Sequence, residues 1–384
     1  MSPDRTSPDT ARGGTPAWIA RALPWVALAV LAALAVAALH KAGNDVQVFR
    51  RAGERFWAGA PLYPPGDGFY SLRYAPGVAA LFTPIGWLSP HAARMAWAAI
   101  TVLVLLAVER LLARRHPGRT WAPLAAMLLL AMPVAHEIQY GQVNAILLLL
   151  VLLGFEAEDR GREGWAGASL AFPVAAKVSP ILLGLDFLAH RRWRAVLGMA
   201  IGGAAVILLP ALRYGLAGAL HQHLAWIGLD AEWSGDVNAL THNQSVWALV
   251  ASLGGGRIPG ALAAAAVVAA AVSEGDREIR RGLLLLAVPL ASPCGWIQNF
   301  LWGIPLVATL VARGGRVARA GALLAGSSLL LSWEVLGPGR LEWALGHRLL
   351  AAEMLALLLV ARFLPRGERP VGVPASTPVI APAR

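Results

Sequence analysis

The stretch Lys41-Ala-Gly-Asn-Asp-Val-Gln-Val-Phe-Arg50 decides the interpretation of the whole chain, because it directly follows the first long apolar run. Residues 18–40 are long and apolar enough to cross a membrane as a helix. Asp45 is the first acidic residue after that run. A carboxylate just beyond a membrane helix lies at the bilayer surface and is partly desolvated. Such a group is either a poised general base or the N-cap of the next helix.

The composition is that of an integral membrane protein. Only 14% of the 384 residues are charged and 57% are hydrophobic, whereas a soluble domain carries about 25% charged residues. The long apolar runs are rich in Ala and Leu and lack the alternation of a β-barrel, so the spans are predicted to be helices. We therefore predict an all-α polytopic bundle of about 12 membrane helices, including short re-entrant ones.

The charge pattern indicates membrane orientation. The net charge is +11, which in a soluble protein would suggest nucleic-acid binding. Here the arginines lie in short loops between apolar runs, as the positive-inside rule predicts. We therefore expect membrane lipid, and no nucleic acid, to be the partner of these charges. Cys294 is the only cysteine, which excludes an intrachain disulfide and a cysteine zinc cluster.

One membrane domain, residues 17–363, is predicted between two tails. Residues 1–16 and 364–384 are rich in proline and lack apolar periodicity, so both are predicted to be disordered and cytoplasmic. Within the domain, residues 41–91 and 213–241 are predicted to form the two large outer loops.

The first outer loop is predicted to begin with an amphipathic helix at residues 46–58. The loop continues with many prolines and aromatic residues. Aromatic side chains gather at membrane interfaces, and an amphipathic helix lies flat on such a surface. We therefore expect this helix to be interfacial.

A second ionisable position lies inside an apolar segment. Residues 164–189 stand between two arginine-rich turns that both mark the cytoplasmic side. Pro173 and Pro180 interrupt the segment, so we predict a hairpin of two short helices with Lys177 at its tip. A lysine placed in this way is a functional-site hypothesis, with phosphate or carboxylate as its partner. The alternative is a lysine that snorkels to the surface.

Further polar residues stand at the outer ends of predicted spans. Their amides either bind a sugar or cap and pack helices, and the indole of Trp296 either anchors the interface or stacks on a substrate. The candidate substrate-binding residues are His136, Glu137, Gln142, Asn144, His242, Asn243, Gln244, Trp296, Gln298 and Asn299.

Several reaction classes are excluded by missing motifs. His221 and His223 face different ways on a helix and have no third ligand at a diagnostic spacing, so no metal site is predicted. A divalent ion held by Asp230, Glu232 or Asp236 is the alternative. The sequence has no P-loop, dinucleotide fingerprint or nucleophile elbow. No segment is large enough for a cytoplasmic domain that binds a nucleotide sugar. A lipid-phosphate donor reached from within the bilayer is therefore predicted.

Taken together, these segments resemble glycosyltransferase family 87, a group of GT-C type that includes polyprenyl-phosphate-mannose-dependent alpha-1,2-mannosyltransferases. The resemblance runs from about residue 41 to residue 305. The matching pieces are Asn44-Asp45 with Phe49, Ala52, Gly59 and Leu62-Tyr63; Phe69 and Tyr74-x-Pro76 with Leu81 and Pro84; Gly141-Gln-x-Asn144; Gly167 with Lys177-x-x-Pro180 and Arg191-Arg-Trp-Arg194; Asn243-Gln-Ser245; and Ser292-Pro with Trp296.

The resemblance implies a GT-C fold and an inverting transfer that needs no metal and no cofactor. It also implies a bacterial plasma membrane with the active site outside. The predicted number of spans puts both termini in the cytoplasm. The aspartate that serves such enzymes as base matches Asp45, and their embedded lysine, near the donor phosphate, matches Lys177. The sequence departs from the family pattern at one place. Many members have a His-His pair where this sequence has Gln298-Asn299. This difference bears on the donor, the acceptor or the activity.

The predicted function is that of a hexosyltransferase. Asp45 would deprotonate an acceptor hydroxyl, on a lipid or glycan, that attacks a polyprenyl-phosphate sugar, most simply mannose. Lys177, assisted by Arg73, would stabilise the leaving phosphate. The alternatives are an inactive family member, a non-catalytic scaffold, and a flippase for a lipid-linked sugar. A flippase would favour internal repeats, which the sequence lacks.

Overall fold

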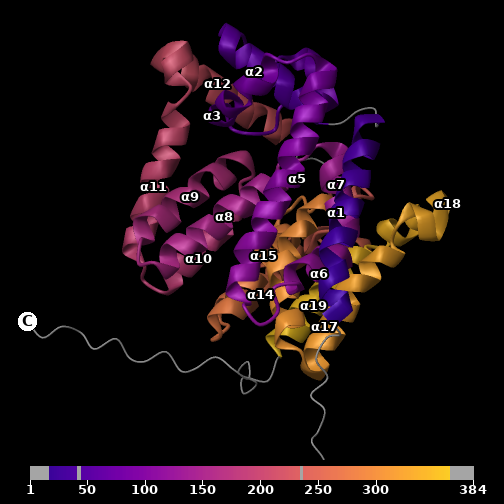
Figure 1. Cartoon of the computed structure of the whole chain (residues 1–384). Helices are drawn as coiled ribbons and strands as arrows, with labels where there is room; N and C mark the ends of the chain where they lie inside the picture. Colours follow the sequence, from indigo (N-terminus) through magenta and orange to yellow (C-terminus); the bar gives the residue numbers. More distant parts are fainter. Residues whose placement is uncertain (1–16, 41–44, 234–236, 364–384) are drawn as a thin grey trace, which may run out of the picture.

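The computed structural model describes residues 17–40, 45–233 and 237–363, and the ordered elements in these ranges are helices (Figure 1). The predicted all-α class is confirmed. Both predicted tails, and residues 41–44 of the opening stretch, lie outside the described residues. The first ten α-helices are α1 (Ala17–His40), α2 (Val46–Ala58), α3 (Pro76–Ala79), α4 (Thr83–Gly86), α5 (Pro90–Arg115), α6 (Ala122–Leu129), α7 (Ala131–Tyr140), α8 (Asn144–Asp159), α9 (Glu163–Ala176) and α10 (Leu182–Ala189).

The second half of the chain is helical as well, and short 3₁₀ helices join several of the longer elements. The remaining α-helices are α11 (Trp193–Leu208), α12 (Ala211–Trp233), α13 (Val246–Ser252), α14 (Arg257–Val272), α15 (Arg277–Ala291), α16 (Ile304–Arg313), α17 (Gly315–Ser327), α18 (Trp333–Gly346) and α19 (Leu349–Arg362). The 3₁₀ helices are η1 (Pro65–Tyr70), η2 (Ala80–Phe82), η3 (Ser179–Ile181), η4 (Val237–Ala239), η5 (Ile297–Gly303) and η6 (Ser328–Leu330).

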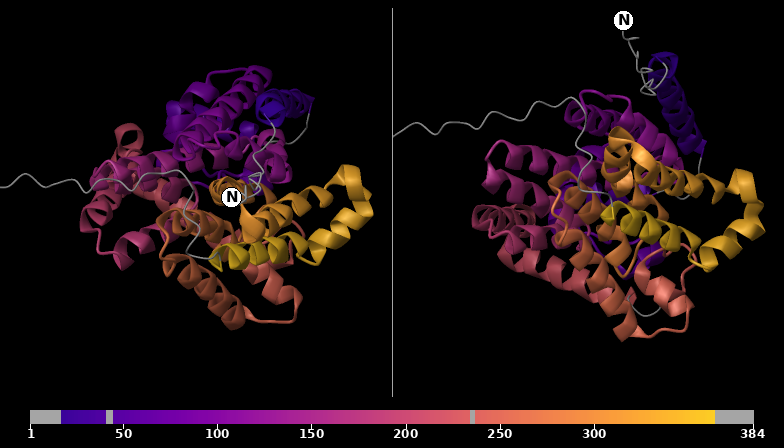
Figure 2. Two further views of the ribbon diagram at one scale, coloured as in Figure 1. Left: turned by 60° about the horizontal axis from the view of Figure 1, so that its bottom comes forward. Right: turned by 90° about the horizontal axis from the view of Figure 1, so that it is seen from below.

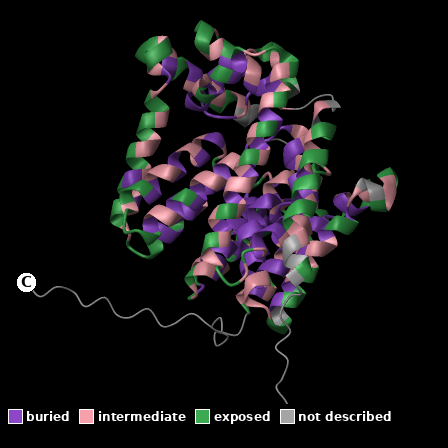
Figure 3. Cartoon of the chain, viewed as in Figure 1, coloured by how far each residue is buried: buried purple, intermediate pink, exposed green. Residues whose placement is uncertain are grey.

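Helix α15 forms the centre of the bundle. Its residues are buried without interruption from Ile279 to Ala291, and Figure 3 shows buried positions concentrated around it. Helix α1 lies at the edge of the bundle and α18 projects from one side, as the views in Figure 2 show. Exposed leucines and isoleucines cover the outer helices, which is the pattern expected of a lipid-facing surface.

The number of membrane spans stays a prediction. Among the described residues, α5 is the one helix long and apolar enough to cross a membrane unaided. Three bent helix pairs, α6 with α7, α11 with α12, and α17 with α18, raise the count to as many as four. Most other helices are shorter than the roughly 20 residues that a span needs, because prolines and glycines interrupt the apolar runs.

The hairpin around Lys177 has the predicted form of two short helices. Helix α9 ends at Ala176, and α10 begins after the short η3, so Lys177 lies at the junction. Helix α9 also packs backbone to backbone against α11. A Cβ added at Gly167 would overlap the carbonyl of Ala195, and one at Gly198 would overlap the carbonyl of Gly164. Only glycine permits this approach.

The second outer loop was predicted at residues 213–241, but the structure has a helix over most of it. Helix α12 turns by 91° from α11. Leu216, Leu220 and Leu224 form one stripe along it and are 60–75% exposed. On the opposite face, Gln222 accepts a hydrogen bond from Leu62 N (3.0 Å) and Trp226 Nε1 donates to Arg73 O (3.1 Å). The helix therefore holds the first outer segment with its polar face.

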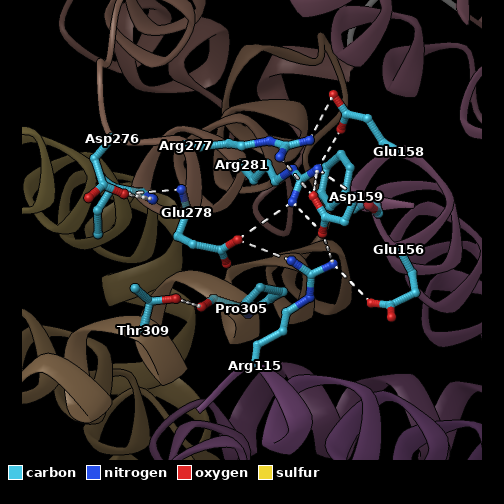
Figure 4. A network of polar contacts seen from close by, with 12 residues as sticks. Arg115, Glu156, Glu158, Asp159, Asp276, Arg277, Glu278, Arg281, Pro305 and Thr309 are labelled. Atoms are coloured by element: carbon cyan, nitrogen blue, oxygen red, sulfur yellow. Dashed lines mark hydrogen bonds and ion pairs between the residues drawn. The ribbon is translucent and has the colours of Figure 1, made fainter. Parts of the chain in front are cut away.

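An ionic network closes the end of α5 that is remote from α2 (Figure 4). Arg115 binds Glu156, Asp159 and Glu278 at 2.8–3.3 Å. Arg281 binds Glu158 and Asp159 at 2.5–3.0 Å. These contacts tie the ends of α5, α8 and α15 together.

Candidate active site

Asp45 occupies the N-cap position of α2, but its side chain makes no capping hydrogen bond. Its Oδ2 instead accepts a hydrogen bond from Gln142 Nε2 (2.5 Å), and its backbone N donates to Tyr140 O (2.9 Å). The carboxylate is therefore directed at the turn between α7 and α8. The alternative in which Asp45 serves only as a cap lacks the hydrogen bond that defines a cap.

The turn between α7 and α8 has its shape because Gly141 ends α7 in the left-handed region, with φ 64°. A Cβ at Gly141 would overlap the side chain of Val46, next to Asp45. Two buried indoles hold the turn from the other side. Trp97 Nε1 donates to Gln142 O and Trp302 Nε1 donates to Asn144 O, both at 3.1 Å.

Lys177 points into the protein. Its Nζ donates to Asn144 Oδ1 (2.7 Å) and to Asn299 Oδ1 (2.9 Å). Both partners are neutral amides on other elements, so the lysine does not snorkel to the surface in this structure. Asn299 is one of the two residues that stand, by the resemblance described above, where a His-His pair is expected, and here it binds the lysine.

Glu137 lies next to Asn144 and is fully buried, with 0% of its surface exposed. Its Oε2 accepts from Asn144 Nδ2 (2.7 Å) and its Oε1 accepts from Ala145 N (2.8 Å). Both carboxylate oxygens are thus bound by the first residues of α8. This geometry does not leave Glu137 free to contact a substrate.

Asp45 and Lys177, the two charged residues that the sequence analysis selected, lie close to each other. Burial raises the pKa of Asp45 above its ordinary value, and the Gln142 hydrogen bond and the positive charge of Lys177 lower it in part. The turn from Gln142 to Asn144 binds Asp45 at one end and Lys177 at the other. A carboxylate and an ammonium are thus bound by the same turn.

Arg73 and Cys294 lie at the lysine side of the site. Burial raises the pKa of the Cys294 thiol to about 12, while the positive charges of Lys177 and Arg73 each lower it. The segment after Arg73 is joined to α9 by Ala75 N, which donates to Ala175 O (3.0 Å). Arg73 and Lys177 are thus both close enough to Cys294 to influence its thiol, and their role in binding phosphate stays a prediction.

Tyr74 is a residue of the site that the sequence interpretation did not select. Burial raises the pKa of its phenol well above the ordinary value, and the negative charges of Asp45 and Glu137 raise it further. The phenol therefore lies near both carboxylates. The sequence signal that could have identified Tyr74 was its place in the Tyr74-x-Pro76 motif of the resemblance. A tyrosine in an aromatic-rich interfacial segment, however, is usually explained by anchoring to the membrane surface alone.

The other candidates divide into two groups. His136 stacks on Tyr140 with ring centroids 5.5 Å apart, and Trp296 and Gln298 are half-buried around η5. By contrast, Asn243 and Gln244 are 0% exposed, and their amides bind backbone groups such as Pro293 O and Leu345 O. These two residues hold the segment before α13 in place, so we leave them out of the proposed substrate site. His242 is exposed beside them.

A small pocket lies at the remote end of α5, lined in part by Arg115, Phe155 and Arg281. The ionic network described above saturates the charges around it. The hollow predicted between Asp45 and Lys177 stays a prediction.

Comparison with known proteins identifies the family. Residues 72–332 match the model of glycosyltransferase family 87. The chain belongs to glycosyltransferase family 87. It is an integral membrane glycosyltransferase, as its composition and the resemblance predicted.

Relatives in this family have named activities. The chain is 27% identical, over 75% of its length and 74% of the relative, to the polyprenol-phosphate-mannose-dependent alpha-(1-2)-phosphatidylinositol mannoside mannosyltransferase of Mycolicibacterium smegmatis. It is 26% identical to the protein of that name from Mycobacterium tuberculosis, over 75% of each chain. It is also 26% identical, over 71% of its length and 72% of the relative, to a pentamannoside mannosyltransferase of Mycolicibacterium smegmatis with the same donor dependence.

Among solved structures, the chain is similar to ArnT from Cupriavidus metallidurans bound to undecaprenyl phosphate. The TM-score is 0.43 and the sequence identity 17%, with 91% of this chain and 77% of the other covered.

Proposed function

We propose that this family 87 enzyme transfers a hexose, specifically mannose, from a polyprenyl-phosphate donor to a lipid or glycan acceptor. The names of its relatives support the donor and the sugar. The observation that carries the proposal is that one turn, residues 141–144, binds both Asp45 and Lys177. A base and a cation held together are what the displacement of a phosphate by a hydroxyl requires.

In the proposed reaction, the acceptor hydroxyl gives its proton to the Asp45 carboxylate while its oxygen attacks the anomeric carbon. The bond between that carbon and the phosphate oxygen breaks, and its electron pair leaves with the phosphate. Lysine has three N–H donors, and Lys177 uses two of them on Asn144 and Asn299. The third would bind the leaving phosphate, with Arg73 beside it.

This mechanism is a single displacement without a protein nucleophile, so it inverts the anomeric centre. It requires neither a metal ion nor a cofactor, and the GT-C fold implied by the resemblance belongs to the same proposal. Asn299 presents an oxygen acceptor to Lys177, at the place where other members have an imidazole. The site is therefore complete without the His-His pair, which favours an active enzyme over an inactive family member.

We place the site on the outer side of a bacterial plasma membrane, with both termini cytoplasmic. Trp97, which binds the turn of the site, lies near the first residue of α5, whereas Arg114 and Arg115 end that helix. The 18 residues from Trp97 to Arg115 correspond to about 27 Å of helix. Arginines concentrate on the cytoplasmic side, so the opposite end, with the site, faces outward.

The experiment is a transfer assay with purified protein, radiolabelled polyprenyl-phosphate mannose and candidate lipid and glycan acceptors. Asp45→Asn should abolish transfer while the protein still inserts and folds. Glu54→Gln is the matched control, because Glu54 lies on the same helix, is exposed and pairs only with Arg50 at the surface. Unchanged product formation by Asp45→Asn would remove Asp45 from the mechanism. Label that crosses liposomes chemically unchanged would instead identify a flippase.

A further inference from the structure

The chain of hydrogen bonds from Glu137 through Asn144 to Lys177 has a fixed direction. An ionised carboxylate only accepts hydrogen bonds, an ammonium only donates them, and a side-chain amide has one end of each kind. Asn144 therefore has to present its Nδ2 to Glu137 and its Oδ1 to Lys177, which is the observed arrangement at 2.7 Å on both sides.

We propose that Glu137 is a positioning residue, which fixes the orientation of the Asn144 amide and through it the place of the Lys177 ammonium that receives the donor phosphate. This inference rests on the proposed function, and it differs from the expectation that Glu137 binds substrate directly. Glu137 is 0% exposed and both its oxygens are bound within the protein, so its hydrogen-bonded path to Lys177 runs through Asn144 and not through a substrate.

The arrangement also explains why the negative charge lies one residue away from the lysine. A carboxylate bound directly to Lys177 would occupy its donors and neutralise it, and a phosphate would have to displace it. With Asn144 between them, the carboxylate still stabilises the ammonium through space, while a donor of Lys177 remains for the phosphate. Asn299 supplies the second neutral acceptor.

A purely structural role for Glu137 makes a different prediction. Its Oε1 binds Ala145 N and thereby supports the first turn of α8. Glu137→Gln can keep this bond through the amide oxygen of the introduced side chain. Its new NH₂ group, however, would face Asn144 Nδ2, donor against donor. The Asn144 amide would then turn and present its own NH₂ to Lys177, which removes an acceptor from the ammonium.

The test compares donor affinity with catalysis. Glu137→Gln should raise the KM for polyprenyl-phosphate mannose by about 10- to 100-fold, because a hydrogen bond to a charged group is lost. The acceptor KM should stay within about twofold, and kcat should change less than the donor KM. Glu353→Gln is the matched control, since Glu353 is a half-buried carboxylate that binds Ser327 Oγ elsewhere in the bundle. Its donor KM should equal that of the unmodified enzyme.

A second readout needs no catalysis. Cys294 is the only cysteine in the chain and lies close enough to Lys177 to be influenced by its charge. Bound polyprenyl phosphate should slow alkylation of Cys294 by a maleimide, and the concentration dependence of this protection gives a Kd. Glu137→Gln should weaken that Kd by the same factor as the KM.

Moving the negative charge from position 137 to position 144 provides a further comparison. In the double variant Glu137→Gln/Asn144→Asp, the introduced glutamine donates to the introduced aspartate, the other oxygen of which accepts from Lys177, and the total charge is unchanged. Because this carboxylate binds the ammonium directly and competes with the phosphate, donor affinity should be no better than that of Glu137→Gln alone. Asn144→Ser, which is too short to reach Lys177, should show the same loss as Glu137→Gln and serves if that variant does not fold.

An unchanged donor KM and an unchanged Kd in Glu137→Gln would overturn the inference, as would a double variant that regains the donor affinity of the unmodified enzyme. Failure of the proposed function is distinguishable from both. In that case the unmodified enzyme itself would show neither mannosyl transfer nor protection of Cys294 by polyprenyl phosphate.

Discussion

Replacement of Lys177 by methionine tests the centre of the proposed mechanism, because methionine has a similar length and no charge. Lys177 Nζ is fixed by two amide oxygens at 2.7 and 2.9 Å. A leaving phosphate whose oxygen accepts a hydrogen bond from the third N–H of Lys177 would lie at a similar distance from Nζ. Two unit charges 4 Å apart interact by about 4 kcal/mol at the effective dielectric of about 20 found near protein surfaces.

That energy sets the expected size of the effect. A change of 1.36 kcal/mol in the activation barrier is about tenfold in rate, so Lys177→Met should lower kcat/KM by about 10³. Lys177→Arg keeps the charge, but its planar fork does not fit the two amide oxygens. Its activity should fall between those of the methionine variant and the unmodified enzyme.

The assay is mannosyl transfer at donor concentrations far below KM, with thermal unfolding in detergent as the control for folding. Lys177→Met also leaves Asn144 and Asn299 without a shared donor, which the unfolding midpoint would report separately. A folded Lys177→Met variant that keeps kcat/KM within tenfold of the unmodified enzyme would refute the assignment of Lys177 to the leaving phosphate.

Three further predictions concern other parts of the molecule. Because burial raises the pKa of Asp45 and only its ionised form accepts a proton, kcat/KM should fall as pH is lowered through this raised value; Gln142→Leu, which removes a hydrogen bond that lowers the pKa, should move this limb of the pH profile to higher pH. Arg281→Met should destabilise the protein by about 1.5–3 kcal/mol in an unfolding titration, because it removes a buried partner of Glu158 and Asp159 while Arg115, Arg192 and Arg277 still pair with them, whereas the exposed Arg160→Gln should cost under about 1 kcal/mol. A polarity-sensitive fluorophore on Leu220→Cys, in a Cys294→Ser background, should shift to the blue in lipid nanodiscs because α12 exposes an apolar stripe; emission equal to that of the same label on Glu54→Cys would contradict an interfacial α12.

The features predicted correctly from sequence were those encoded by local chemistry. The amphipathic pattern fixed the bounds of α2 at Val46–Ala58. Two prolines placed the break of the hairpin at Lys177. The proximity of Asp45 and Lys177, in contrast, depends on contacts across 97 and 33 residues, between Asp45 and Gln142 and between Lys177 and Asn144. Only the family resemblance suggested it in advance.

The wrong or undecided predictions arose where one residue pattern suits two structures. Helix α12 was missed because Gly215, Gly218 and His221 interrupt its apolar periodicity, while its polar face is satisfied only by contacts with the first outer segment. For Asn243 and Gln244 the sequence left sugar binding and helix capping open, and in the structure their amides bind backbone carbonyls. Sequence alone does not distinguish these uses, because both require a buried polar side chain at a helix start.

The backbone contact between α9 and α11 has a consequence for the lipid environment of the enzyme. Glycines at this contact let the two helices pack backbone to backbone, and the 14 residues of α9 separate its arginine-rich start from Lys177 by about 21 Å. The protein therefore fixes the depth of the Lys177 ammonium in the membrane, whereas the plane of the phosphate headgroups moves with the thickness of the bilayer. In a thicker membrane the donor phosphate would have to enter the bilayer more deeply to reach Lys177. The thickness of the host membrane would therefore affect how readily the sugar is delivered.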